Sequence, residues 1–342
     1  MIKTGVAYLE TRNPRHVRED LEDIVSHGCD FVIHAYSEFD FHFHSLVMRE
    51  IVKISHDLGL EVYLNPWGLG KVFGGIEPLS RFVAEYPDQC QRMNDGSHAP
   101  IACLHSRPFR DLMLFWIDAA ADAGADILFW DEPHYHYSLD TLLGKGQQQR
   151  WACACERCRD LFRAQFKRAL PQELDQEVIR FRDDAIIEFL SELTDYAQKK
   201  GLKNAVCVLP DENPIVGVST WESLARIPSL SIFGTDPYWM LYDKPLEEYV
   251  SQKSRRVIEL CSRYGKEAQI WVQAFLIPAG RENDVGRTVE VIAAEGVKNI
   301  AAWAYLGTAF MNHKCADHQK VWDVLGEAYK KIKTQDMSDR TG

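Results

Sequence analysis

The chain has 342 residues, and 50 Asp or Glu against 39 Lys or Arg give it a net charge of −11 at neutral pH. Phosphate binding depends on clustered cations, and the only notable basic cluster, residues 253–256, lies in a predicted helix, so nucleic acid is not expected as a partner. No apolar run approaches the length of a membrane span, so no membrane association is expected.

Eight apolar runs rich in β-branched residues alternate with segments of helical periodicity along the whole chain. The runs begin at Thr4, Cys29, Leu60, Ala125, Lys203, Leu230, Ala268 and Lys298. Several of the intervening segments end in glycine, which helix C-termini prefer. Eight strand–helix units in this length predict an α/β fold of the (β/α)8 TIM-barrel type. A doubly wound open sheet is the alternative, but no GxGxxG follows the first strand.

Two connections are longer than a bare barrel needs: residues 67–104 after the third strand and residues 133–201 after the fourth. Long insertions at the C-terminal ends of strands usually build the wall of a site or a lid. We predict one barrel domain over residues 1–333 and a disordered tail over residues 334–342.

The N-terminal residues lack an apolar stretch of signal-peptide length, so we expect a cytoplasmic protein. Nine cysteines are an odd number for a disulfide framework, and in that compartment most should be reduced thiols. The sequence leaves the oligomeric state open, including a homo-oligomer.

Polar and aromatic residues follow most of the predicted strands, where barrel enzymes place their catalytic groups. Amides and hydroxyls can bind the hydroxyl groups of a sugar, and aromatic rings can stack on its C–H face. We therefore predict a small carbohydrate as substrate, with no organic cofactor. The predicted substrate-binding residues are Tyr8, His34, Asn65, Trp67, His134, Tyr238, Trp239, Gln273, Trp303 and Tyr305.

Three carboxylates are the predicted catalytic residues: Asp131 and Glu132 in "ILFWDEPHYHYS", and Asp236 in "GTDPYW". Adjacent carboxylates repel each other, which raises the pKa of one of them and suits a proton donor. Side chains alternate along a strand, so only one of Asp131 and Glu132 can point inward unless the strand has ended there. Glycosidic cleavage needs such a pair of carboxyl groups, which predicts a glycoside hydrolase. The structural alternatives are a strand cap for Asp131 and a turn before proline for Asp236.

The stretch "WACACERCRDLF" contains three cysteines in the pattern C-x-C-x-x-C, which predicts a structural zinc site. Tetrahedral zinc usually takes a fourth ligand, and the candidates are a histidine or one of five other cysteines. Those cysteines are Cys90, Cys103, Cys207, Cys261 and Cys315. We favour Cys103, because it precedes the helix that leads into the fourth strand and its loop should open on the same side of the barrel as the other three.

Residues 100–162 resemble the zinc-binding region of family 42 β-galactosidases. The resemblance lies in "IACLHSRPFRDLML", in a fourth strand that closes with "DEP", and in C-x-C-x-x-C followed by an aromatic residue. It implies a structural Zn²⁺ held by Cys103, Cys153, Cys155 and Cys158. "DEP" also resembles the "NEP" of the wider clan, which implies that Glu132 is the acid/base.

The seventh strand departs from that clan's pattern. The clan has its nucleophilic Glu at the end of this strand, whereas this chain has Gln273, an amide that cannot attack an anomeric carbon. Another clan of barrel glycosidases uses an Asp after the fourth strand as nucleophile and an Asp after the sixth as acid/base, which would fit Asp131 and Asp236.

Two other functions compete with the glycosidase prediction. One is a metal-dependent sugar isomerase or lyase with ligands from His34, Glu132, Asp236 and His134. The other is a non-catalytic carbohydrate-binding barrel, which Gln273 suggests. A further motif, "FDFHFHS" at residues 39–45, predicts a strand-to-helix loop whose phenylalanines pack inward.

Overall fold

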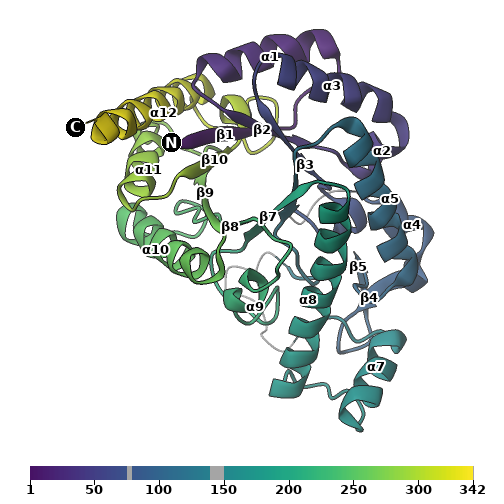
Figure 1. Cartoon of the computed structure of the whole chain (residues 1–342). Helices are drawn as coiled ribbons and strands as arrows, with labels where there is room; N and C mark the ends of the chain where they lie inside the picture. Colours follow the sequence, from purple (N-terminus) through teal and green to yellow (C-terminus); the bar gives the residue numbers. More distant parts are fainter. Residues whose placement is uncertain (75–78, 139–149, 342) are drawn as a thin grey trace.

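A computed structural model describes residues 1–74, 79–138 and 150–341 and shows a closed barrel of eight parallel strands (Figure 1). The strands follow one another around the barrel in chain order, and the last pairs with the first, so the (β/α)8 prediction is confirmed. The barrel strands are β1 (Lys3–Tyr8), β2 (Phe31–Ala35), β3 (Glu61–Asn65), β6 (Ile127–Asp131), β7 (Lys203–Val208), β8 (Ile232–Thr235), β9 (Glu267–Gln273) and β10 (Asn299–Trp303).

Helices surround the barrel in the described part of the chain (Figure 1). The longer ones are α1 (Pro14–Ser26), α3 (Ser45–Asp57), α5 (Arg107–Ala123), α7 (Glu156–Phe166), α8 (Gln176–Lys199), α10 (Leu246–Tyr264), α11 (Asn283–Ala294) and α12 (His318–Thr341). Short helices are α2 (Glu38–Phe43), α4 (Arg81–Glu85) and α9 (Trp221–Ala225), with 3-10 turns at Leu69–Lys71, Pro87–Gln89 and Tyr305–Thr308. No helix within the described ranges is long and apolar enough to cross a membrane.

Alternation along each barrel strand sends side chains into two separate apolar layers. The inner layer fills the barrel with residues such as Ile33, Phe129 and Trp271. The outer layer, which includes Val32 and Leu128, packs against the helices. Whether a strand residue can reach a site at the barrel mouth therefore depends on which of these layers it faces.

The predicted long connections after the third and fourth barrel strands are present. The first contains a two-stranded antiparallel sheet of β4 (Cys90–Arg92) and β5 (His98–Ala102). A single β-bridge between Met93 and Ala152 ties this connection to the second one. The two insertions thus form one structure on the side of the barrel.

The C-terminal segment is helical, which differs from the disorder predicted for residues 334–342. Helix α12 continues to Thr341. Its Asp336 is buried and accepts hydrogen bonds from the Ile2 backbone N–H at 3.2 Å and from Lys298 at 2.7 Å. These contacts hold the last turns of the helix beside β1.

The motif "FDFHFHS" also differs from its prediction. Residues 38–43 form the short helix α2, started by a capping box between Ser37 and Asp40. Phe41 packs inward, but Phe39 and Phe43 are 63% and 69% exposed. A helix of this length can turn only one of its faces toward the core.

Candidate functional site

Asp131 is the last residue of β6 and lies on the inward side of that strand. Asn65, at the same end of the neighbouring strand β3, donates a hydrogen bond to its carboxylate at 3.4 Å. Burial, followed by the charge of Glu132, raises the pKa of Asp131 well above its ordinary value, and the hydrogen bond from Asn65 opposes this rise.

Glu132 reaches the same site because its backbone leaves the strand conformation. Its φ is +41°, in the left-handed region that non-glycine residues seldom occupy. The Glu132 N–H still pairs with the Cys207 carbonyl at 2.9 Å, while its own carbonyl is bound by His134 Nδ1 at 2.6 Å. This turn overrides the alternation that would send Glu132 outward. Strained backbone of this kind often occurs at functional sites.

Asp236 follows β8 and forms a hydrogen-bonded carboxyl pair with Glu132. Two carboxyl groups can share a hydrogen bond only if one of them is protonated. Burial and then the charge of Glu132 raise the pKa of Asp236 well above its usual range, and the shared hydrogen bond raises it further. Burial also raises the pKa of Glu132, and that hydrogen bond opposes the rise, so burial favours a protonated carboxyl group in this pair.

The second oxygen of Asp236 is buried and has no protein partner among the described residues, and the same is true of the Asn65 side-chain oxygen. Two buried acceptors beside one carboxyl cluster are suited to a ligand that donates hydrogen bonds, such as a hydroxyl group.

Partly exposed aromatic rings lie at the same end of the barrel. The rings of Trp67 and Trp303 are 6.0 Å apart, and Trp303 is 6.4 Å from Trp271 in the inner layer. Gly74 makes room for Trp67, because a Cβ at position 74 would lie 1.9 Å from the indole. The Gly74 N–H donates to the Asp131 carbonyl at 2.8 Å, which links the aromatic wall of Trp67 and Trp303 to strand β6.

Tyr238 also lies near the carboxyl groups. It is partly exposed, its ring stacks edge-on against Phe275 at 5.1 Å, and after burial the charge of Asp236 contributes to raising its pKa. Tyr137 and Tyr242 occupy similar positions, since burial and then the charges of Glu132 and Asp236 raise the pKa of both. The sequence prediction missed these two, although each lies within a few residues of a predicted catalytic acid.

Tyr8 and Tyr305 were predicted to bind sugar, and the structure corrects this. Tyr8 is on the outward side of β1, where its hydroxyl donates to Asp20 of α1 at 2.5 Å. The Tyr305 hydroxyl donates to the same carboxylate at 3.3 Å. Both side chains belong to the layer between barrel and helices, because alternation along β1 and the turn after β10 send them there.

His34 and Trp239 need the same correction. His34 is on the outward side of β2, fully buried, and its Nε2 is 2.9 Å from the Ser55 hydroxyl of α3. Burial lowers its pKa to about 3, so it is neutral. Trp239 is buried in the outer layer and offers no open stacking face. The metal-dependent alternative loses His34 as a ligand.

Gln273 points inward, but its amide already has partners within the protein. Its oxygen accepts from the backbone N–H groups of Met240 at 3.1 Å and Leu241 at 3.3 Å, and its nitrogen donates to the Phe275 carbonyl at 3.1 Å. The side chain therefore positions the loop after β8 instead of presenting a free amide, contrary to the predicted sugar-binding role.

His134 is buried beside the carboxyl cluster. Its ring lies 4.9 Å from that of Tyr137, and burial lowers its pKa to about 4, which keeps it neutral. Its hydrogen bond to the Glu132 carbonyl supports the turned backbone of that residue.

The predicted cysteine site is present. The sulfurs of Cys103, Cys153, Cys155 and Cys158 all lie within 4.8 Å of one another and are buried. Across residues 1–74, 79–138 and 150–341 this is the only group of three or more His, Cys, Asp or Glu side chains arranged to hold a metal ion. Four sulfurs around one point suit a tetrahedral ion.

Two arginines accompany the cysteines. Arg157 interacts electrostatically with Cys103, Cys155 and Cys158. Arg182 of α8 is buried, lies 3.9 Å over the Tyr135 ring, and interacts electrostatically with Cys153 and Cys158. Its Nη2 donates to the Ile215 carbonyl at 2.8 Å, while Nε and Nη1 have no hydrogen-bond partner among the described residues. Four thiolates around a divalent ion carry two negative charges, which these guanidinium groups would balance.

The cysteine site is connected to the carboxyl site through the start of the loop after β6. The Tyr135 hydroxyl donates to the Arg182 carbonyl at 2.8 Å. The next residue, His136, donates its N–H to the Gln91 side chain of β4 at 3.1 Å. Residues 139–149 of this loop and residues 75–78 of the loop after β3 lie outside the described part.

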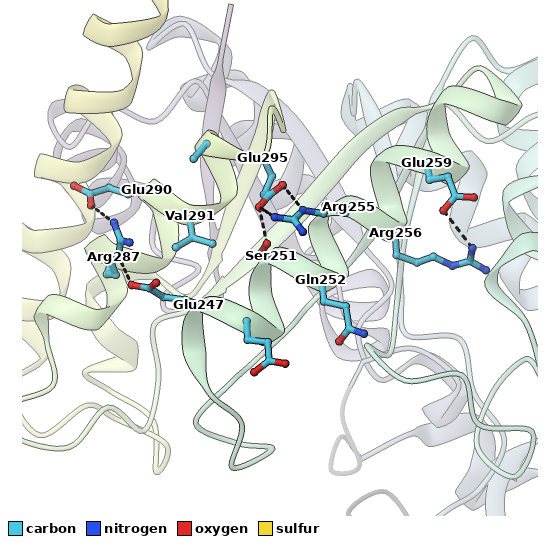
Figure 2. A pocket seen from close by; sticks show the side chains of 12 residues that line it. Glu247, Ser251, Gln252, Arg255, Arg256, Glu259, Arg287, Glu290, Val291 and Glu295 are labelled. Atoms are coloured by element: carbon cyan, nitrogen blue, oxygen red, sulfur yellow. Dashed lines mark hydrogen bonds and ion pairs between the residues drawn. The ribbon is translucent and has the colours of Figure 1, made fainter.

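A separate groove of about 870 Å³ lies on the outside of the barrel between α10 and α11 (Figure 2). Its charged side chains pair with each other, for example Arg287 with Glu247 at 2.8 Å and Arg255 with Glu295 at 2.7 Å. None of the predicted site residues lines it. The mouth of the barrel therefore remains the candidate site.

No family model and no curated protein sequence matches the chain, so the resemblance to family 42 is not shown. Many solved structures share the fold. An endo-1,4-β-mannanase from Rhizomucor miehei matches with a TM-score of 0.65 and 10% identity, over 97% of this chain and 95% of its own. An endo-β-1,4-mannanase from Thermotoga petrophila gives 0.61 and 11%, over 98% and 77%.

A D-allulose 3-epimerase from Methylomonas sp. also matches, with a TM-score of 0.51 and 11% identity, over 97% of each chain. Glycoside hydrolases and sugar epimerases thus share this architecture. At such low identity the likeness shows the fold, a TIM barrel of the kind found in sugar-active enzymes.

Proposed function

We propose that the protein is a glycoside hydrolase that cleaves a small glycoside or oligosaccharide at the C-terminal mouth of its barrel. One observation carries the proposal: the carboxyl groups of Asp131, Glu132 and Asp236 interact with one another at the barrel mouth, and burial raises the pKa of each. Glycosidic cleavage needs a carboxylic acid and a carboxylate near the same bond, and this cluster supplies both.

Asp236 is the general acid in this mechanism. Its raised pKa favours the protonated form, and this proton passes to the glycosidic oxygen as the bond to C1 breaks. Glu132 accepts the hydrogen bond from Asp236 in the resting state and so holds the acid in position.

Asp131 acts on the opposite side of the sugar, either as the nucleophile that bonds to C1 or as the base that activates water. Asn65 donates to this carboxylate and stabilises its charged form. The fourth barrel strand, β6, then supplies the nucleophile or base, and β8, the sixth, supplies the acid. Gln273 needs no chemical role in this scheme.

The aromatic wall gives the substrate its orientation. Trp67, Trp303 and Tyr238 are the predicted aromatic residues that stay partly exposed at the mouth, so they can stack against the C–H face of a sugar ring. The unpartnered oxygens of Asn65 and Asp236 would accept hydrogen bonds from its hydroxyl groups.

The cysteine cluster fits a structural Zn²⁺ in a protein with reduced thiols, as in the cytoplasm. Four sulfurs fill a tetrahedral shell and leave no open position for substrate, so the ion would stabilise the insertion and not take part in the reaction. A metal-dependent isomerase is disfavoured, because His34 faces the helices and the carboxyl groups do not converge as a metal site in the described chain.

The experiment is a panel of nitrophenyl glycosides assayed with the wild type and with Asp131→Asn, Glu132→Gln and Asp236→Asn. We expect turnover to fall about 10³-fold or more for Asp131→Asn and Asp236→Asn. The matched control is Asp211→Asn, an exposed acid paired with Lys253 after β7, which should keep full activity.

Leaving groups separate the two roles. Asp236→Asn should recover much of its rate on a dinitrophenyl glycoside, whose leaving group needs no proton, whereas Asp131→Asn should not. Full turnover by all three variants on a substrate that the wild type cleaves would show that the assignment is wrong.

A further inference from the structure

The three carboxyl groups at the barrel mouth have no cationic partner within the described chain. Across residues 1–74, 79–138 and 150–341, no Lys or Arg forms an ion pair with Asp131, Glu132 or Asp236. By contrast, Asp211 after β7 pairs with Lys253 at 2.6 Å. Without a ligand, the cluster therefore keeps an unbalanced negative charge, and buried charges are normally paired.

A lysine near the mouth acts on other groups. Burial lowers the pKa of His134 and of His136, and the charge of Lys71 contributes to lowering both. In the described part of the chain, neither this lysine nor any other Lys or Arg is among the groups that shift the pKa of the three carboxyl groups. The protein thus leaves their charge for something else to neutralise.

An independent observation points to a ligand that donates hydrogen bonds. Asn65 is only 1% exposed, and its side-chain nitrogen donates to Asp131 at 3.4 Å, but its side-chain oxygen has no partner among the described residues. One oxygen of Asp236, a residue that is 3% exposed, is in the same position. Buried acceptors without partners cost free energy, which a ligand with N–H or O–H groups would recover.

Two side-chain donors beside the carboxyl groups are already used within the protein. The Gln273 nitrogen donates to the Phe275 carbonyl at 3.1 Å, and His134 Nδ1 lies 2.6 Å from the Glu132 carbonyl. The unpartnered polar atoms around the carboxyl groups are therefore acceptors. An ammonium group has three N–H donors and no acceptor, and it carries the charge that this cluster lacks.

The aromatic residues of the mouth suit the same group. The partly exposed rings of Trp67 and Trp303 are 6.0 Å apart, and Tyr137 and Tyr242 lie close enough to the carboxyl groups to interact with their charges. The faces of Trp and Tyr attract cations. A metal ion would need several oxygens around one point, and the described carboxyl groups are not arranged in that way. An organic cation fits both the rings and the acids.

Glu132 is the acid that the chemistry leaves over. In the proposed hydrolase function, on which this inference rests, Asp236 is the acid and Asp131 is the nucleophile or base. A third carboxylate beside them is unfavourable, because buried like charges repel each other, and a substrate of opposite charge would remove this repulsion. We propose that the substrate is an amino sugar with a free ammonium group, which Glu132 binds.

The test is isothermal titration calorimetry of the full chain with free monosaccharides, in which no bond is cleaved. The probes are glucosamine, galactosamine and mannosamine, each compared with its neutral parent sugar and with its N-acetyl form. We expect at least one amino sugar to bind about 10-fold or more tightly than both of its uncharged counterparts, because hydrogen bonds between charged groups are stronger than neutral ones.

Glu132→Gln keeps the shape of the side chain but removes its charge, so it should reduce this preference to about 2-fold or less. The matched control is Asp211→Asn at the same end of the barrel, whose charge Lys253 already balances, and it should keep the full preference. Circular dichroism of each variant checks that it is folded.

Absence of saturable binding by all three amino sugars would overturn the proposal, and so would a preference that Glu132→Gln retains or that Asp211→Asn loses equally. Ca²⁺ that displaces the amino sugar and loses affinity in Glu132→Gln would assign the site to a metal ion and also overturn it.

Hydrolysis distinguishes this inference from the proposed function. Cleavage of neutral nitrophenyl glycosides by a protein that does not prefer amino sugars would overturn the inference and keep the hydrolase. Binding of an amino sugar without cleavage of any nitrophenyl glycoside, the glucosaminide included, would overturn the hydrolase and keep the ammonium site.

Discussion

The cysteine cluster and the carboxyl cluster are both buried, and each consists of side chains of one kind. They differ in the charged groups beside them. The cysteines have Arg157 and Arg182 beside them. The carboxyl groups have only Asn65 and each other among the groups that shift the pKa of Asp131 and Glu132. The first cluster can be neutralised by a cation and its arginines, whereas the second lowers its charge only by keeping protons.

This difference has opposite consequences for stability. Removing one ligand from a metal site whose charges are balanced lowers stability, because the remaining ligands lose the metal ion that neutralises them. Replacing an acid of an uncompensated site with an amide removes the free-energy cost of keeping that acid protonated in the folded state. The cysteine cluster and the carboxyl cluster should therefore respond to mutation with opposite signs, which the following predictions test from the largest effect to the smallest.

Cys103→Ser should have the largest effect on stability. It removes the ligand that joins the loop before α5 to the insertion after β6, and we expect the bound metal to be lost and the free energy of unfolding to fall by about 3 kcal/mol or more. Metal content by mass spectrometry and urea unfolding provide the measurement. Cys261→Ser, a buried thiol outside the cluster, is the control and should keep its metal. Full metal content in Cys103→Ser would contradict the site.

Arg182→Met should weaken metal binding without removing a ligand. It keeps the apolar stem but deletes the buried positive charge, and we expect an affinity about 10- to 100-fold lower in competition with a chromophoric chelator. Arg180→Met on the same helix changes an exposed arginine and should leave the affinity unchanged. Equal affinities for the two variants would show that Arg182 does not compensate the thiolates.

Asp236→Asn should stabilise the protein by about 1–2 kcal/mol at pH 7 while it abolishes turnover. Burial raises the folded-state pKa of Asp236 above its unfolded value. The folded state then holds a proton that the unfolded state releases, so this group lowers stability as pH rises through that window. The gain should therefore vanish below about pH 4, where the carboxyl is protonated in both states. A variant that is less stable than the wild type at pH 7 would contradict the comparison.

Tyr8→Phe should have the smallest effect. The lost hydrogen bond to Asp20 should cost about 0.5–1.5 kcal/mol of unfolding free energy, and KM and kcat should not change because the hydroxyl points away from the mouth. Steady-state kinetics on any cleaved glycoside checks this. A clear rise in KM would return Tyr8 to the substrate site.

Much of the fold could be predicted from the sequence because the barrel strands are short apolar runs with clear boundaries. Sequence also identified the cysteine site, since three ligands lie close together in the chain and Cys103 precedes a helix on the same side. Both features depend on local patterns. The helical end of α12 could not be predicted this way, because it depends on the contact of Asp336 with Ile2 at the other end of the chain.

The candidate site was predicted only in part. A position at a strand end predicts proximity to the substrate, yet Tyr8 and His34 lie one position out of phase with the inward residues and face the helices. Gln273 is in phase, but backbone groups of the loop after β8 already occupy its amide. Neither the phase of a strand nor the partners of a loop can be read from residue type alone.

The left-handed φ of Glu132 reduces the number of strands that are needed to bring two acids to one site. A strand that ends normally contributes one inward side chain at its last position, so two acids would have to come from two strands. The left-handed φ at Glu132 lets β6 supply two consecutive acids to the same mouth. A substitution that relaxed this one angle would therefore remove a carboxyl group from the site without changing the chemistry of any side chain in it.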